Sequence, residues 1–163
     1  MFSYLGAVDE SLNDKLTAVS DFLERAEVPY KVEDDIMRRM WNKLMLNVGI
    51  NQTCMVFDCG YGGAVVPGSL EYMTFVSAMR ETMLCANAEG IDLNEDDLSI
   101  FIDLIRGLAP DTMPSMRQDR LNKRKSEVEL FAGTVIRTAE RHGIAVPVND
   151  FLYRRVMEIE SEY

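Results

Sequence analysis

The sequence predicts a mainly helical, all-α protein with a short strand-helix-strand segment at its N-terminus. Apolar residues recur mostly at helical spacing along the 163-residue chain. Only two short segments, "MFSYLG" and "VPYKV", have the composition of strands. Residue types that begin and end helices stand between the apolar stretches. We therefore expect about six helices with short connections and little sheet.

The N-terminal segment predicts one helix between the two strand candidates. Residues 10–26, "ESLNDKLTAVSDFLERA", carry an apolar stripe at helical spacing. The stripe consists of Leu12, Leu16, Val19, Phe22 and Leu23. Because this helix lies between "MFSYLG" and "VPYKV", the opening of the chain predicts a strand, a helix and a second strand.

The next helices are marked by residues that favour helix ends. A helix is expected from about Asp34 to Asn51, and another from Ser69 to Glu89, where Gly90 suits a left-handed C-terminal cap. Asn94 is expected to cap the following helix, which "GLAP" ends. These signals predict three consecutive helices with short connections.

Two capping boxes and a proline predict the remaining helices. "SMRQ" at Ser115 and "SEVE" at Ser126 both fit the S-x-x-E/Q pattern, so each is expected to open a helix. In the second box we assign Glu129 as the structural partner of Ser126. A last helix is expected after Pro147.

The composition narrows the classes of partner and compartment. Hydrophobic residues make up 47% of the chain and charged residues 27%, which suits a globular core. The 17 basic and 27 acidic residues leave a net charge of −10, which disfavours nucleic acid and anionic membranes as partners. Three cysteines without a disulfide pattern, together with the lack of a long apolar run or a secretory signal, predict a cytoplasmic protein.

Several short motifs have structural interpretations. "GYGGAV", residues 60–65, partly fits a dinucleotide fingerprint, but no βαβ unit surrounds it, so we expect a loop. Cys54 and Cys59 lack nearby His or Cys partners, so a buried or partly buried thiol pair is expected instead of a metal site. His142, the only histidine, stands in "RHG" at a helix end and gives little support to a catalytic triad. The basic run "RLNKRK", 120–125, is expected to be a solvated linker.

One polar column within the predicted helix 34–51 is a candidate site. In "KLMLNVGIN", Lys43, Asn47 and Asn51 follow one another at intervals of four residues, which places them on one helix face. The lysine could simply extend to water, and the asparagines could satisfy neighbouring carbonyls. Alternatively, a lysine beside apolar walls can donate a proton while two amides hold a small polar substrate. The second interpretation requires a hydroxyl and a carboxylate nearby.

Four motifs in order resemble one family. "W-x-K-L-x-x-N-x-x-x-N" at 41–51, "SM-x-QD" at 115–119, "S-E-V-E" at 126–129 with Gly133 in the same helix, and "HGIAVPVN" at 142–149 are similar to the C-terminal half of ketopantoate reductase (2-dehydropantoate 2-reductase). The likeness extends from about Gly6 to the end of the chain. It implies the mainly helical C-terminal domain of a 6-phosphogluconate-dehydrogenase-like reductase in residues 35–163. Residues 1–34 would then be the end of an N-terminal Rossmann domain.

The resemblance also implies roles for five residues. Lys43 matches the catalytic lysine, the general acid that protonates the ketone oxygen of a small 2-keto acid. Asn47 and Asn51 match asparagines that line the substrate site. Ser115 matches a serine that binds the substrate, and Glu127 matches the glutamate that engages its hydroxyl end. Each of the last two has a simpler alternative, because Ser115 could be only an N-cap and Glu127 only a charge that favours the helix dipole.

The resemblance further implies NADPH as the hydride donor of the complete enzyme. The glycine fingerprint of the Rossmann domain is missing from this sequence, so the chain is expected to be a reductase fragment that neither binds NADPH tightly nor acts alone. Where the family often has Asn-Pro, this chain has Asn51-Gln52, which puts the local turn in doubt. Exposed apolar surface favours a homodimer. The alternative is a helical dimerisation or interaction module, or the C-terminal domain of a related 2- or 3-hydroxy-acid dehydrogenase.

Overall fold

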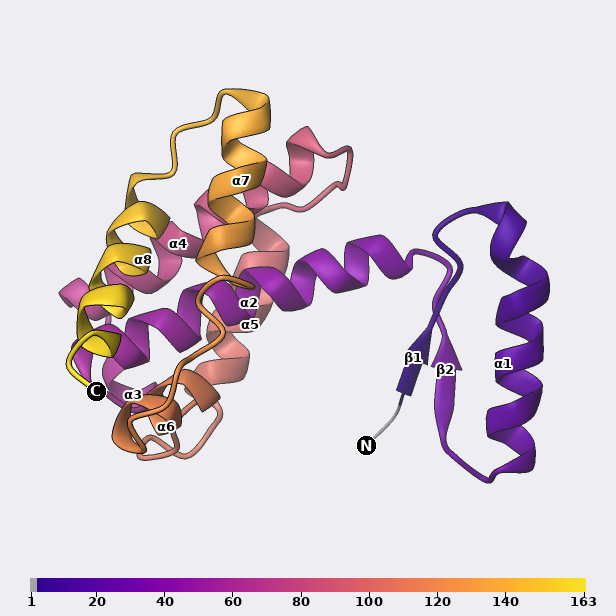
Figure 1. The fold of residues 1–163 in the computed structure, drawn as a ribbon, viewed down its shortest axis with the longest axis horizontal. Helices are drawn as coiled ribbons and strands as arrows, with labels where there is room; N and C mark the ends of the chain where they lie inside the picture. The colour runs from indigo at the N-terminus through magenta and orange to yellow at the C-terminus, as the bar shows by residue number, and fades with distance from the viewer. Residues whose placement is uncertain (1–2) are drawn as a thin grey trace. The chain divides into compact units, whose positions relative to one another are not determined.

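Helices dominate the computed structural model, which describes residues 3–163 (Figure 1). Within this range the chain forms eight α-helices, one 3-10 helix and one pair of strands. The predicted mainly helical class is therefore confirmed, with two helices more than the six expected. The chain divides into two compact units, of which one ends at Trp41 and the other comprises Asn42–Tyr163.

The first unit contains the predicted strand-helix-strand segment. β1 (Ser3–Leu5) and β2 (Tyr30–Val32) are parallel, with Tyr4 opposite Lys31. The 3-10 helix η1 (Glu10–Leu12) and α1 (Asn13–Arg25) form the crossover that a parallel pair requires. The first two residues of the predicted strand "MFSYLG" lie outside the described residues. For the rest, both strands and the helix between them are confirmed.

The second unit is built from helices alone. Its first helix, α2, begins in the other unit and runs without a break past Asn51, because "QTCMVF" contains no helix-breaking residue. It ends where Asp58 adopts a left-handed φ of 53°. The helices are α2 (Ile36–Phe57), α3 (Tyr61–Ala64), α4 (Leu70–Ala88), α5 (Glu95–Arg106), α6 (Ser115–Leu121), α7 (Ala132–His142) and α8 (Pro147–Glu160).

α2 and α4 approach each other closely at Gly49. A Cβ added to Gly49 would lie 2.6 Å from Cγ of Met79 and 2.8 Å from Cδ2 of Phe75, so the glycine allows the two helices to approach. Phe75 and Met79 are fully buried. Figure 1 shows α4, α7 and α8 grouped together, and the three helices contact one another. Long apolar side chains at their interfaces supply the main stabilisation of this unit.

Three of the predicted helix ends are confirmed. The Ser69 hydroxyl accepts a hydrogen bond of 3.0 Å from the Tyr72 N–H, which makes Ser69 the N-cap of α4. Gly90 has a φ of 82° just after the same helix. Asn94 and Asp97 form a reciprocal capping box at the start of α5. Because these interactions span only a few residues, local sequence is enough to predict them.

A helix opens at the first serine box, as predicted, but neither serine forms a capping box. Ser115 is the first residue of α6, and Pro114 occupies the cap position. Ser126 opens no helix, since α7 begins at Ala132. The N–H and hydroxyl of Ser126 donate instead to Oε1 of Glu160, at 2.8 and 2.6 Å. A carboxylate distant in sequence thus competes successfully with the local cap.

Candidate functional site

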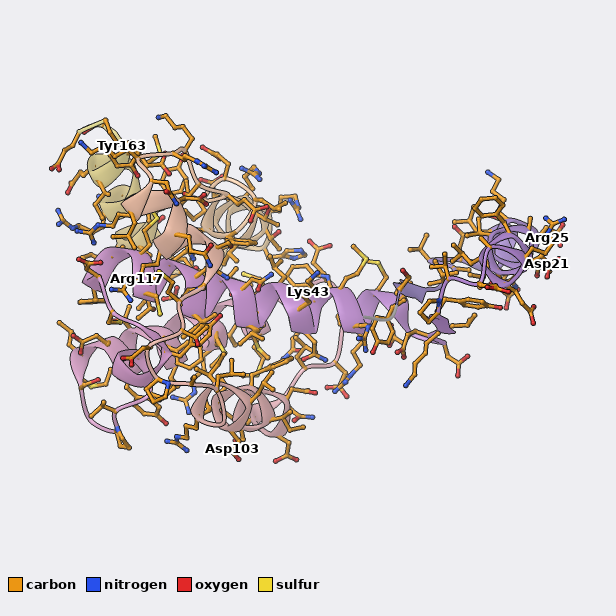
Figure 2. All side chains as sticks on the ribbon, turned by 90° about the horizontal axis from the view of Figure 1, so that it is seen from below. Asp21, Arg25, Lys43, Asp103, Arg117 and Tyr163 are labelled. Atoms are coloured by element: carbon orange, nitrogen blue, oxygen red, sulfur yellow. The ribbon has the colours of Figure 1, made fainter. Side chains whose placement is uncertain are left out.

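The column on α2 passes from solvent into the protein interior. Lys43 is exposed, Asn47 is half-buried and Asn51 is buried. Figure 2 labels Lys43 on this helix. All three residues belong to the second unit. The charged end of the column is therefore accessible to a ligand, while its amide end is held by the fold.

Asn51 joins the column to α6. Its Oδ1 accepts hydrogen bonds from the Ser115 hydroxyl at 3.1 Å and from the Met116 N–H at 3.3 Å. Its Nδ2 donates to Oδ1 of Asn47 at 3.4 Å. The structure thus brings together three of the five candidate residues. Ser115 is not an N-cap, because its hydroxyl bonds to a side chain on another helix.

Two arginines whose contacts the sequence did not predict hold α6 at the end of α2. Arg120 donates from Nη1 to the carbonyl oxygens of Met55 at 2.6 Å and Val56 at 3.3 Å. Nε of Arg117, labelled in Figure 2, donates to Oδ1 of Asp58 at 3.3 Å. The carbonyls at a helix C-terminus attract cations such as Arg120, and Arg117 pairs with the Asp58 carboxylate just after the helix. Both guanidinium groups therefore fix the helix that carries Ser115. The three-residue spacing of Arg117 and Arg120, which places them on one face of a helix, was the sequence signal for these contacts. The contact of Arg120 with α2 contradicts, for this residue, the solvated linker expected for "RLNKRK".

Lys43 and Glu127 are not joined to the amide and hydroxyl cluster. Within residues 3–163, neither side chain forms a hydrogen bond or an ion pair with another described residue, and both are exposed. Glu127 lies in the turns before α7 and not in the same helix as Gly133, contrary to the expected motif. Its position is set by its neighbours, since Ser126 is bonded to Glu160 and Val128 is buried. Both charged groups are thus available to a ligand.

The glycines of "GYGGAV" have a packing role. The segment forms the one-turn helix α3 and not the expected loop. The Gly62 N–H donates to the carbonyl oxygen of Pro110 at 2.9 Å, and a Cβ on Gly60 would lie 2.6 Å from that oxygen. The glycines therefore allow close backbone approach to the segment before α6, and this use accounts for them without a bound phosphate.

The "HGIAVPVN" motif also serves the fold. The buried carboxylate of Glu81 on α4 accepts hydrogen bonds of 2.8 Å from the N–H groups of both Val148 and Asn149. Nδ2 of Asn149 donates to the same carboxylate at 2.7 Å. A carboxylate at the first N–H groups of a helix satisfies donors that the helix itself leaves free. This motif therefore attaches α8 to α4.

Two classes of site find no support in the part of the chain that is described. Across residues 3–163, no three His, Cys, Asp or Glu side chains are grouped so that they could hold a metal ion. None of the helices in this range has the length and apolar character needed to cross a membrane. The three cysteines are free thiols, with Cys54 buried and Cys59 half-buried, as the expected thiol pair requires.

Residues 35–160 match the family described as "Ketopantoate reductase PanE/ApbA C terminal". The chain belongs to this family. Over 154 residues the chain is 27% identical to the 2-dehydropantoate 2-reductase of Vibrio cholerae, an alignment that covers 94% of this chain and 51% of the relative. The chain therefore spans about half the length of the curated reductases that it matches.

Solved structures share the fold. A dimeric ketopantoate reductase from Staphylococcus aureus superposes with a TM-score of 0.84 at 20% identity, covering 99% of this chain and 55% of the other. A D-mandelate dehydrogenase bound to NADH and anilino(oxo)acetate superposes with a TM-score of 0.85 at 21% identity, covering 98% of this chain and 66% of the other. At these identities the likeness establishes the ketopantoate reductase C-terminal fold and does not distinguish substrates.

Proposed function

We propose that this chain forms the substrate-binding, C-terminal part of a 2-dehydropantoate 2-reductase, which reduces ketopantoate to pantoate with NADPH. The observation that carries the proposal is the hydrogen-bonded set of Asn47, Asn51 and Ser115, one helical turn from the exposed ammonium of Lys43. A purely structural interface would not need a free ammonium beside a set of ordered amide and hydroxyl groups. The curated relatives named 2-dehydropantoate 2-reductase support the assignment.

The chemistry of a 2-keto acid fits these groups. The Lys43 ammonium donates a proton to the ketone oxygen, where negative charge develops during reduction. The Asn47 amide and the Ser115 hydroxyl face the substrate's polar groups, while Asn51 holds both in place. The Glu127 carboxylate accepts a hydrogen bond from the hydroxyl at the far end of ketopantoate. NADPH, when bound to the complete enzyme, supplies the hydride.

The domain assignment belongs to the same proposal. We assign residues 1–34 to the end of a Rossmann domain and residues 35–163 to the helical substrate domain. The parallel pairing of β1 and β2 across the α1 crossover supports the first part, because such units build Rossmann sheets. The family match over residues 35–160 supports the second. We also propose that the protein acts in the cytoplasm, in keeping with its three free thiols.

Kinetics of a chimaera test the proposal. The chain is joined to the N-terminal half of the Vibrio cholerae relative, and ketopantoate reduction is followed through NADPH absorbance. Lys43→Ala is expected to lower kcat by about 10² to 10⁴ with a much smaller change in KM, because a general acid acts on charge that develops in the transition state. An unchanged kcat in Lys43→Ala would end the proposal.

Two glutamates separated by one residue provide a matched control. Glu127→Gln is expected to impair both kcat and KM, on the order of 10² in kcat/KM, because loss of the hydroxyl anchor misplaces the ketone. Glu129 instead accepts from the Tyr153 hydroxyl and from Nη1 of Arg137. Glu129→Gln is therefore expected to leave the kinetics nearly unchanged. With a 2-keto acid that lacks the hydroxyl of ketopantoate, Glu127→Gln and Glu129→Gln should have similar kcat/KM values.

Variants of the amide and hydroxyl cluster test substrate binding separately from proton transfer. Asn47→Ala and Ser115→Ala are expected to act mainly by raising KM. Asn51→Ala should also destabilise the protein, because the Ser115 hydroxyl and the Met116 N–H lose their acceptor. Equal losses of kcat in all three variants, with KM unchanged, would contradict the assigned roles.

Cofactor binding and assembly are tested on the chain itself. We expect no saturable change in NADPH fluorescence at micromolar protein, since dinucleotide affinity depends on a glycine-rich turn at a helix N-terminus. Tight stoichiometric binding would refute the domain assignment. We also propose a homodimer, in keeping with the dimeric Staphylococcus aureus enzyme. Sedimentation at several concentrations tests this, and a monomer throughout would exclude the dimer.

A further inference from the structure

The end of α2 places two cysteine side chains against each other. The Cys59 N–H donates to the carbonyl oxygen of Cys54 at 3.2 Å, and Asp58 between them has the left-handed φ of 53°. This is the six-residue bond of a Schellman motif, in which the side chains of the first and last residues commonly touch. Here those two side chains are thiols, and each thiol shifts the pKa of the other.

The two thiols differ in burial and in acidity. Cys54 is fully buried, and its pKa is raised because its proton is held by the Cys59 sulfur and because burial disfavours the thiolate. The pKa of Cys59 is lowered, chiefly by the hydrogen bond from Cys54 and further by Arg117. Burial and the Glu71 carboxylate oppose this shift without reversing it. The half-buried thiol is therefore the one that ionises first.

The surrounding structure holds Cys59 in a defined position. A Cβ on Gly63 would lie 2.8 Å from Cβ of Cys59 and 3.4 Å from its sulfur, so α3 passes directly over the side chain. Nε of Arg117 donates to Oδ1 of Asp58, next to Cys59 in the chain. A thiolate beside a guanidinium and a second thiol has the surroundings of a reactive cysteine with a resolving partner.

We propose that Cys59 and Cys54 form a thiol-disulfide exchange site for small disulfides. The Cys59 thiolate attacks one sulfur of the small disulfide, forms a mixed disulfide and expels one thiolate. The Cys54 sulfur then attacks Sγ of Cys59, expels the second half as a thiolate and passes its proton to one of the two leaving groups. One small disulfide is thereby reduced to two thiols, and the protein pair is oxidised to one disulfide.

Cys85 is an internal control for this reaction. It is fully buried, its Sγ donates to the carbonyl oxygen of Val135 at 3.7 Å, and burial raises its pKa to about 11. A buried thiol without a second cysteine beside it is out of reach of disulfides and alkylating agents in solution, whereas Cys54 has only to attack a disulfide on the neighbouring Cys59. Cys59 is therefore expected to react with iodoacetamide at least about tenfold faster than Cys85 in the same sample.

The experiment treats the reduced full chain with oxidised glutathione and follows intact mass and peptide maps. The unaltered chain is expected to lose the mass of two hydrogen atoms and to yield a Cys54–Cys59 crosslinked peptide. Cys54→Ala should instead retain one glutathione on Cys59, and Cys59→Ala should give neither product. A stable glutathione adduct on the unaltered chain would overturn the resolving role of Cys54. Equal alkylation of Cys59 and Cys85, which needs no variant, would overturn the site altogether.

Discussion

Helices α1 and α4 use their apolar residues differently. α1 has 13 residues and buries none of them, although its apolar positions form a regular stripe. α4 has 19 residues and buries nine, because neighbouring helices pack around it. Phe22 on α1 is 61% exposed, whereas Phe75 on α4 is 0% exposed. A regular stripe predicts that a helix forms, but only its neighbours decide whether the stripe is buried.

The same contrast holds for the two units that contain these helices. The first unit has a parallel pair of three-residue strands and one exposed helix. A sheet of this size gains little stability by itself, and the α1 stripe, of which Leu12, Leu16 and Leu23 are only half-buried, contributes less than a buried one. The second unit has its own core of fully buried side chains. We therefore expect the local stability of the two units to differ widely.

The largest expected effect is a difference in amide hydrogen exchange. The free energy of local opening should be lower in α1 than in α4 by at least about 3 kcal/mol, or roughly a hundredfold in exchange rate. Exchange followed by mass spectrometry of peptides from residues 13–25 and 70–88 measures the difference. Equal protection of the two helices would show that α1 draws stability from interactions beyond its observed burial.

The same substitution in α1 and α4 is expected to have different effects on stability. Phe75→Ala should lower the free energy of unfolding of the second unit by about 3 to 5 kcal/mol, because it leaves a cavity beside Gly49 and Met79. Phe22→Ala should change stability by about 0.5 kcal/mol or less, since its ring is largely exposed. Urea denaturation followed by circular dichroism gives both values. Similar losses of stability in the two variants would contradict the difference in burial between the two phenylalanines.

A pair of glutamates tests polar interactions in the same two helices. Glu81→Ala should cost about 2 to 4 kcal/mol, because three N–H donors at the start of α8 lose a charged acceptor. Glu24→Ala, at an exposed position of α1, should cost about 0.5 kcal/mol or less. Thermal unfolding of both variants checks the prediction. A Glu81→Ala protein as stable as the unaltered chain would mean that water replaces the carboxylate.

The smallest expected effect concerns the ion pair between α4 and α5. Arg80 donates from Nε and Nη2 to Glu95 at 2.8 and 2.9 Å, and this hydrogen bonding lowers the pKa of the Glu95 carboxyl. A carboxyl with a lowered pKa stabilises the fold above its usual pKa, and this contribution is lost as the pH falls through the lowered value. Both side chains are exposed, so the pair contributes about 0.5 kcal/mol or less at pH 7.

Unfolding of Glu95→Gln across the acid range measures that contribution. The variant should be slightly less stable than the unaltered chain at pH 7, and the difference should vanish at low pH, where Glu95 is protonated in both states. High salt should reduce the difference at pH 7, because the pair is exposed to solvent. A difference that grows as the pH falls would contradict the assigned sign.

Only part of the candidate site could be predicted from the sequence. The four-residue spacing of Lys43, Asn47 and Asn51 places them on one helix face regardless of the rest of the fold. The contact between Asn51 and Ser115 joins residues 64 positions apart, and no local pattern predicts it. The S-E-V-E motif identified Glu127 as a candidate. That Glu127 lies in a turn follows from the hydrogen bond between Ser126 and Glu160, which the motif does not predict. The roles of all five residues in catalysis or binding stay predictions.

Local sequence was enough to predict the mainly helical class and the helix ends whose caps lie within a few residues, such as Ser69 and Asn94. It did so because helix spacing and capping depend on neighbours in the chain. Tertiary structure decided which side chain each polar group contacts. Ser126 donates to the Glu160 carboxylate and does not cap a local helix. Arg120 donates to a carbonyl oxygen at the end of α2. The reason is that a buried carboxylate or carbonyl must find a partner, and the partner nearest in space can lie far away in sequence.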